Sequence, residues 1–135
     1  MAVEREIRIK AYEIDAMGVV SNIEYVKWFE DIRHDFLDRY YPYDEMMKRH
    51  LSPVLINTDI RYRIPLTIHD RPVGRCWVTK MGRAKWEIRF EIGSEAGVHC
   101  TGVQTGGFYD VAARKPAPIP DRLREAFGRE AAAIR

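Results

Sequence analysis

The sequence is poor in cysteine and contains no long apolar run. Its two cysteines, Cys76 and Cys100, lie in strand-like segments without Cys-x-x-Cys or zinc-ligand spacing. We expect both to be free, buried thiols in a reducing cytoplasm. No apolar run approaches the roughly 20 residues of a membrane span, and the N-terminus lacks the apolar stretch of a signal peptide. The absences predict a cytoplasmic protein without a membrane span.

The sequence also lacks an excess of one charge. Its 22 basic and 20 acidic residues are interspersed and leave a formal net charge of +2, so no nucleic-acid-binding or membrane-binding patch is visible. The four histidines are scattered without metal-ligand spacing. There is no P-loop, no dinucleotide glycine fingerprint, no His-Glu-x-x-His and no Gly-x-Ser-x-Gly motif. We therefore expect a site without a cofactor or metal, and no nucleic-acid partner.

A long helix stands out in what is present. From Asn22 to Tyr40 apolar residues recur at three- and four-residue steps, with charged residues on the opposite side. The apolar face is largely aromatic: Tyr25, Trp28, Phe29, Ile32, Phe36 and Tyr40. Pro42 ends the pattern, and residues 44–50 are typical of a short helical turn. Such a face needs a broad surface to cover it.

The rest of the chain is typical of strands. Alternation predicts strands over residues 3–12, 54–66, 73–81, 86–92 and 98–111, with a bulge near Gly106-Gly107. A proline-rich link leads to a short helix over residues 121–128. The 135 residues suit one domain, 1–135. The predicted fold class is α+β: an antiparallel five-stranded sheet wrapped around one long helix, plus a short C-terminal helix.

The segment from Asp15 to Asn22 is the candidate for chemistry. It places a carboxylate in a glycine-containing turn beside the unpaired N–H groups of a helix start, where a developing oxyanion is stabilised. A carboxylate next to such donors is a minimal acyl-transfer site. The residues alone favour a simpler interpretation, in which Asp15 caps the helix and Gly18 serves the turn.

A family resemblance alters that balance. Residues 12–33, Tyr-Glu-Ile-Asp-Ala-Met-Gly-Val-Val-Ser-Asn-Ile-Glu-Tyr-Val-Lys-Trp-Phe-Glu-Asp-Ile-Arg, resemble the signature of hot-dog-fold acyl-CoA thioesterases of the 4-hydroxybenzoyl-CoA thioesterase-like family. Later segments agree: residues 62–70, the turn at 81–83 and the tail 118–123. The resemblance implies that Asp15 is the catalytic nucleophile or general base, and that the Asn22 backbone N–H is the oxyanion donor. It also implies a substrate-binding role for Gly18, Val19, Tyr25 and Arg83.

The resemblance further implies a hot-dog fold and a homodimer or homotetramer with sites at the dimer interface. The expected substrate is an acyl-CoA, hydrolysed to a carboxylic acid and free CoA. An acyl-carrier-protein thioesterase and a non-catalytic acyl-binding hot-dog module are the alternatives. Three residues depart from the family pattern: Ile14, Glu24 and Lys85. Glu24 either adds a second acidic group near Asp15 or points to solvent, and we favour the latter.

Overall fold

One antiparallel sheet curls around the long helix. The computed structural model describes residues 1–134. Its six strands follow the order β1-β3-β4-β5-β2, and β6 pairs with the end of β5. The strands are β1 (Ala2–Glu6), β2 (Leu51–Tyr62), β3 (Val73–Met81), β4 (Trp86–Ser94), β5 (Gly97–Asp110) and β6 (Lys115–Ala117). The helices are α1 (Asn22–Tyr40), α2 (Tyr43–Lys48) and α3 (Asp121–Ile134), with a 3-10 turn η1 (Ala11–Glu13).

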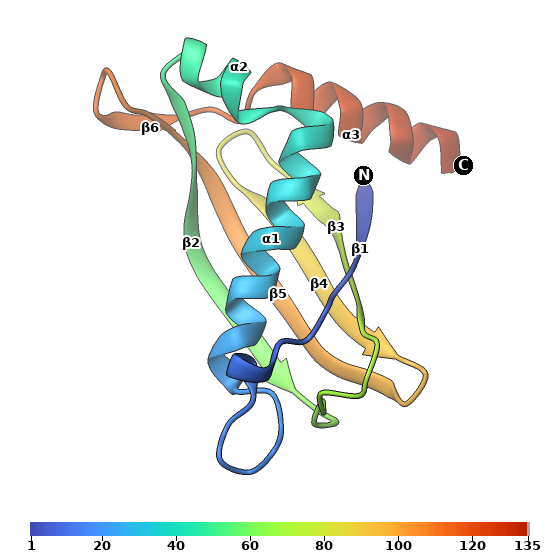
Figure 1. Cartoon of the computed structure of the whole chain (residues 1–135). Coiled ribbons are helices and arrows are strands. Elements are labelled where there is room, and N and C mark those ends of the chain that lie inside the picture. The colour runs from blue at the N-terminus through green and yellow to red at the C-terminus, as the bar shows by residue number, and fades with distance from the viewer. Residues whose placement is uncertain (135) are drawn as a thin grey trace.

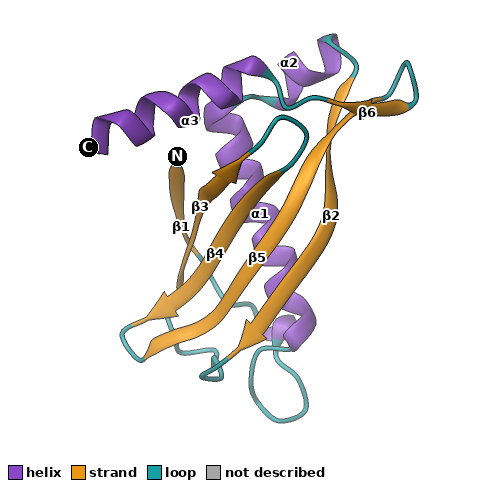
Figure 2. Ribbon diagram, turned by 180° about the vertical axis from the view of Figure 1, so that it is seen from behind, coloured by secondary structure: helices purple, strands orange, loops and turns teal. Residues whose placement is uncertain are grey.

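The aromatic face of α1 forms the centre of the core. Figure 1 shows α1 lying across one face of the sheet, and Figure 2 shows the opposite face of the sheet without a helix over it. Phe29 is fully buried and stacks on Phe90 of β4, with ring centroids 4.5 Å apart. Gly102 of β5 leaves room for that ring, because a Cβ at this position would lie 2.3 Å from Phe29 Cε2. The predicted helix and its burial in a sheet are confirmed.

Several predicted boundaries are wrong at the edges of the sheet. The first strand ends at Glu6 rather than continuing to residue 12, and residues 11–13 form η1. Ile7 and Ile9 are buried, as the alternation predicted. Their backbone is no longer paired with β3, because the ladder ends at Glu6 and Val73. The second strand spans Leu51–Tyr62 rather than 54–66. It stops short of residue 66 because Pro65 cannot donate a hydrogen bond to a neighbouring strand.

Three further differences concern the end of the chain. β5 runs through Gly106 and Gly107 without a break, and the irregularity lies instead on β2 between Leu55 and Asn57. The short β6 adds a sixth strand to the predicted five; its Pro116 masked it in the sequence because proline cannot donate to a ladder. α3 continues past Gly128 to Ile134. The α+β arrangement itself is confirmed.

The sheet has two ends that matter for the site. Glu6 pairs with Val73 in the register of β1 and β3, so the chain leaves β1 at the Val73 end and reaches Asp15 there. The loop 63–72 meets the same end, because Val20 N donates to Leu66 O at 2.8 Å. The turn between β3 and β4 lies at the other end, near α3 (Figure 1).

Candidate active site

The Asp15 turn is a small closed loop. Asp15 N donates to Val19 O at 2.8 Å, and Gly18 N donates to Asp15 O at 3.0 Å. The carboxylate folds back on the same loop: its Oδ1 accepts the backbone N–H of Met17 at 2.8 Å and that of Val19 at 3.4 Å. Gly18 has a φ of +80°, which favours glycine. The loop therefore holds the exposed Asp15 carboxylate through Oδ1.

Asp15 does not cap the helix, so the capping interpretation is wrong. The residue before α1 is Ser21, and within the described residues 1–134 its side chain makes no capping hydrogen bond. Asn22 is the first residue of α1, and over residues 1–134 the structure gives its backbone N–H no hydrogen-bond acceptor. The carbonyl of Asn22 accepts the Tyr62 hydroxyl at 3.1 Å. A free N–H at a helix start, flanked by a fixed carboxylate loop, can receive a developing oxyanion.

A buried glutamate ties the loop to the helix. Glu13, only 6% exposed, accepts the Lys10 backbone N–H at 2.7 Å through Oε1 and the Trp28 indole N–H at 3.1 Å through Oε2. Its carbonyl accepts the Ser21 N–H at 2.9 Å. We did not predict a role for Glu13. The spacing from Lys10 to Glu13 was the only local signal, since it is the spacing of a capping box.

We expected the Glu24 side chain to point to solvent, and this prediction is wrong. Its side chain is 8% exposed and pairs with Lys27 Nζ at 3.3 Å. Glu24 also lines a hollow of about 470 Å³ together with Glu13 and Trp28. The first turn of α1 supplies Glu24 next to the aromatic face, so packing rather than solvation decides its position.

Tyr25, predicted to bind substrate, is 3% exposed and lies edge-on to Trp28 and Tyr62 with ring centroids 5.3 Å and 5.4 Å away. Burial raises the pKa of its hydroxyl to about 12. The phenol therefore stays protonated at neutral pH. In this chain Tyr25 supports the start of α1 from within the core.

The predicted residues fall into two groups in space. Asp15, Gly18, Val19 and Asn22 share one end of the sheet. Arg83 follows β3 at the opposite end, and its carbonyl accepts the Ile119 N–H at 2.8 Å. β3 runs from Val73 to Met81, so its length of roughly 3.3 Å per residue separates the two groups within one chain.

Arg83 lines a basic hollow of about 490 Å³ at its end of the sheet. Its other basic lining residues are Arg49, Arg122 and Arg124. Arg122 pairs with Glu45, and Arg124 pairs with Asp121. This end of the molecule is suited to an anionic ligand.

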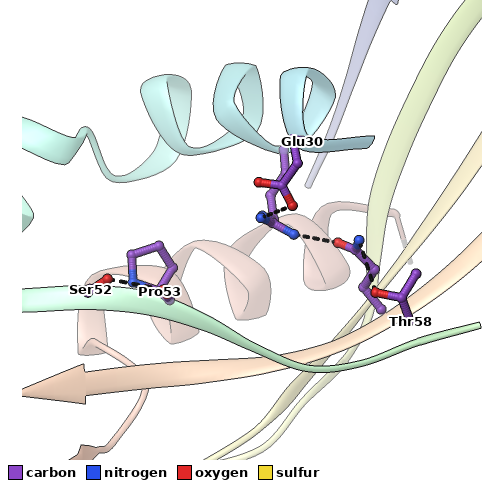
Figure 3. Close-up of polar contacts among 6 residues, drawn as sticks. Glu30, Ser52, Pro53 and Thr58 are labelled. Carbon is purple, nitrogen blue, oxygen red and sulfur yellow. Dashed lines mark hydrogen bonds and ion pairs between the residues drawn. The ribbon is translucent and has the colours of Figure 1, made fainter. Parts of the chain in front are cut away.

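A second polar network lies between α1 and the sheet. Arg33, with a side chain 11% exposed, donates at 2.6 Å both to Glu30 Oε1 and to Gln104 Oε1, and Gln104 Nε2 donates to Thr58 Oγ1 at 3.4 Å. Figure 3 shows Glu30 and Thr58 at the two ends of this chain of contacts. Sequence reasoning missed it because β5 and β2 must first bring Gln104 and Thr58 under the helix.

Other candidate groups have structural positions. Cys76 and Cys100 are free and buried, as predicted, and burial raises the pKa of each thiol to about 12. His34 is exposed and lies 3.4 Å from Asp38. Within residues 1–134, no three histidine, cysteine or acidic side chains gather in a way that could hold a metal ion. No helix in that range is both long and apolar enough to cross a membrane.

The departures from the family pattern are also placed. Ile14 packs against the core and bridges to Val20, closing the Asp15 loop. Lys85 is exposed, and its carbonyl accepts the Gly82 N–H at 2.9 Å in the turn that carries Arg83.

The curled sheet around α1, with its loop at the helix start, defines a hot-dog-fold protein. Residues 9–127 match the Thioesterase-like superfamily, and the chain belongs to this family.

Individual relatives agree with this assignment. The chain is 38% identical over 64 residues to a putative esterase of Aquifex aeolicus, covering 47% of this chain and 50% of the relative. It is 27% identical over 67 residues to the long-chain acyl-CoA thioesterase FadM of Escherichia coli, covering 50% of this chain and 51% of the relative. The chain thus spans about half the length of these curated relatives. The structure of a DHNA-CoA thioesterase from Staphylococcus aureus superposes with a TM-score of 0.86 at 24% identity, over 97% of this chain and 91% of that one, and so shares its fold.

Proposed function

We propose that this chain hydrolyses an acyl-CoA thioester to a carboxylic acid and free CoA. The observation that carries the proposal is a fixed, exposed Asp15 carboxylate on the loop that leads into α1, whose first residue, Asn22, has an unpaired N–H within residues 1–134. Membership of the Thioesterase-like superfamily supports the reaction class. The relatives described as acyl-CoA thioesterases support the substrate class.

The chemistry follows from the position of the groups. Asp15 either attacks the thioester carbonyl or removes a proton from the attacking water. The tetrahedral oxyanion accepts a hydrogen bond from Asn22 N–H, where the dipole of α1 adds to its stabilisation. A thiol with an ordinary pKa of about 8.5 leaves readily as thiolate, so no strong acid is required. Gly18 and Val19 form the wall of the substrate site beside Asp15.

The proposal extends to a homodimer that pairs the free edges of two β2 strands. Within residues 1–134, β2 has a strand neighbour on one side only, and its edge region exposes Val54, Leu55 and Ile56 by 38%, 42% and 54%. Pairing two such strands antiparallel about a two-fold axis inverts one protomer relative to the other. The Arg83 end of one chain then lies beside the Asp15 end of its partner, where Arg83 binds the phosphates of CoA.

Asp15→Asn tests the catalytic role. It keeps the size of the side chain and removes the base or nucleophile, so kcat should fall about 10²–10⁴-fold. The measurement is thiol release from short, medium, long-chain and aromatic acyl-CoAs. Asp44→Asn, an exposed carboxamide change at the start of α2, is the matched control and should retain wild-type rates.

The same assays separate the alternatives. Full activity of the Asp15→Asn variant would remove Asp15 from the mechanism. Turnover of an acylated carrier protein without turnover of any acyl-CoA would instead identify a carrier-protein thioesterase. Binding of acyl-CoA without turnover of either substrate would identify a non-catalytic acyl-binding module.

A further inference from the structure

Glu13 is an acidic side chain that the proposed chemistry does not use and that the structure nevertheless buries. A carboxylate that is 6% exposed is costly unless its oxygens are hydrogen-bonded. Both oxygens are: Lys10 N–H binds Oε1 and the Trp28 indole N–H binds Oε2. The two donors come from different elements, so the two hydrogen bonds together fix the orientation of the Glu13 side chain.

The contacts of Glu13 join the two halves of the site. Through Lys10 the side chain fixes η1, the turn that leads into Asp15. Through Trp28, fifteen residues along the chain, it fixes η1 to α1. Its backbone carbonyl adds a bond to Ser21, the residue before the oxyanion donor. Residue 13 therefore connects the base of the Asp15 loop to the helix that presents Asn22.

We propose that Glu13 is a positioning residue for thioester hydrolysis, which holds the Asp15 loop at a fixed distance and orientation from the N-terminus of α1 by bridging Lys10 N–H and the Trp28 indole. The inference rests on the proposed function. Glu13 makes no contact with the substrate in this proposal and acts only through Asp15. A misplacement of about 1 Å in a reacting group can cost about 10²-fold in rate, so a small change in this bridge should lower kcat.

Glu13→Gln is the variant that tests the bridge. It preserves volume but replaces one acceptor oxygen with an N–H₂ group, which opposes either the Lys10 N–H or the indole N–H. We expect kcat to fall about 10- to 100-fold with KM within about twofold of wild type. Trp28→Phe removes the indole donor from the other side and should lower kcat in the same direction. Glu4→Gln, on an exposed position of β1, is the matched control and should leave kcat unchanged.

A double-mutant cycle with Asp15 separates positioning from a general loss of stability. If Glu13 acts only through Asp15, adding Glu13→Gln to Asp15→Asn lowers kcat no further. A second loss of the same size in the Asp15→Asn background would overturn the proposal, as would unchanged kcat in Glu13→Gln. Rates are expressed per folded protein, with the folded fraction measured by circular dichroism. Wild-type activity in Asp15→Asn alone would instead contradict the proposed function, so the two failures are distinguishable.

Discussion

Gly18 is the residue at which the backbone of the Asp15 loop is most constrained. Its φ is +80°, yet no atom of the described part of the chain lies within 4 Å of the place where a Cβ would stand. Gly18→Ala should therefore lower the free energy of unfolding through backbone strain alone, by about 1–2 kcal/mol. Gly18→Asn should cost less, because asparagine tolerates this region. Urea unfolding followed by circular dichroism measures both.

A second glycine supplies the control for this prediction. Gly128 lies inside α3 without a positive φ, and among the residues that the structure describes no atom lies within 4 Å of a new Cβ there. Gly128→Ala should raise the free energy of unfolding by up to about 1 kcal/mol, because alanine favours a helix. Equal effects of the two alanine substitutions would contradict the role given to the φ of Gly18.

At the residue scale, the sequence predicted the groups that act locally and missed those that act across the fold. The Asp15 loop and the start of α1 at Asn22 follow from short-range turn and helix signals. The bridge from Glu13 to Trp28 spans fifteen residues, and its existence depends on how η1 packs against α1. The prediction that Glu24 is exposed was wrong for the same reason. A charged residue at a helix start is expected to be exposed unless its neighbours in the fold are known.

The packing of α1 on the sheet depends on one close approach between elements. Gly102→Ala would place its Cβ 2.3 Å from Phe29 Cε2 and 2.7 Å from Cζ, in a ring that is fully buried. Relief requires movement of α1 or of β5, and we expect a loss of about 1–3 kcal/mol in the free energy of unfolding. Thermal unfolding by differential scanning calorimetry measures this loss.

Phe29→Leu tests the origin of that loss. Alone it should destabilise the protein by removing core volume. Combined with Gly102→Ala, it removes the ring atoms that clash, so the double variant should be more stable than the sum of the two single effects predicts. Additive effects would show that the strain at Gly102 does not come from Phe29.

At the element scale, side-chain periodicity predicted an element correctly where one of its faces is buried. It failed where backbone hydrogen bonding to a neighbouring strand determines whether a segment is a strand. α1 was predicted from Asn22 to Tyr40 and lies over those residues. Ile7 and Ile9 alternate and are buried, yet they lie outside the strand because the ladder of β1 with β3 ends at Glu6 and Val73, beyond which Ile7 N–H donates to Pro72 O at 2.9 Å. β6 was missed for the converse reason, since its pairing with β5 leaves little trace in side-chain pattern.

For the molecule as a whole, three buried groups predict sensitivity to alkaline pH. Burial raises the pKa of Cys76 and of Cys100 from 9.0 to about 12, and that of Tyr25 from 10.0 to about 12. The unfolded chain releases these protons at lower pH than the folded one, so the stability they contribute is complete below about pH 9. It declines as pH rises toward 12, by up to about 1.4 kcal/mol per pH unit for each group.

Urea unfolding at a series of pH values from 8 to 11 measures this decline. The variant Cys76→Ala/Cys100→Ala retains only Tyr25 of the three groups, so its stability should fall less steeply with pH than that of the wild type. Parallel curves for the two proteins would contradict the assignment of the decline to the buried thiols.

The proposed dimer makes a prediction about assembly. Leu55→Asp replaces an apolar side chain, 42% exposed on β2, with a charge, and a charged residue on an edge strand opposes pairing with another strand. The dimer should dissociate, and sedimentation velocity measures the change in mass. Val111→Asp, a residue 55% exposed just after β5, is the matched control and should keep the wild-type mass. A monomeric wild-type protein would contradict the dimer outright.

Complementation between chains tests whether Arg83 reaches the partner's Asp15. Asp15→Asn and Arg83→Ala should each be defective alone. When the two are unfolded together in equal amounts and refolded, half of the dimers are mixed. Each mixed dimer has one site with Asp15 from one chain and Arg83 from the other. About a quarter of the wild-type activity should return, because one of two sites is intact in half of the dimers. No recovery would mean that Arg83 does not serve the partner's site, and full activity of Arg83→Ala alone would remove it from substrate binding.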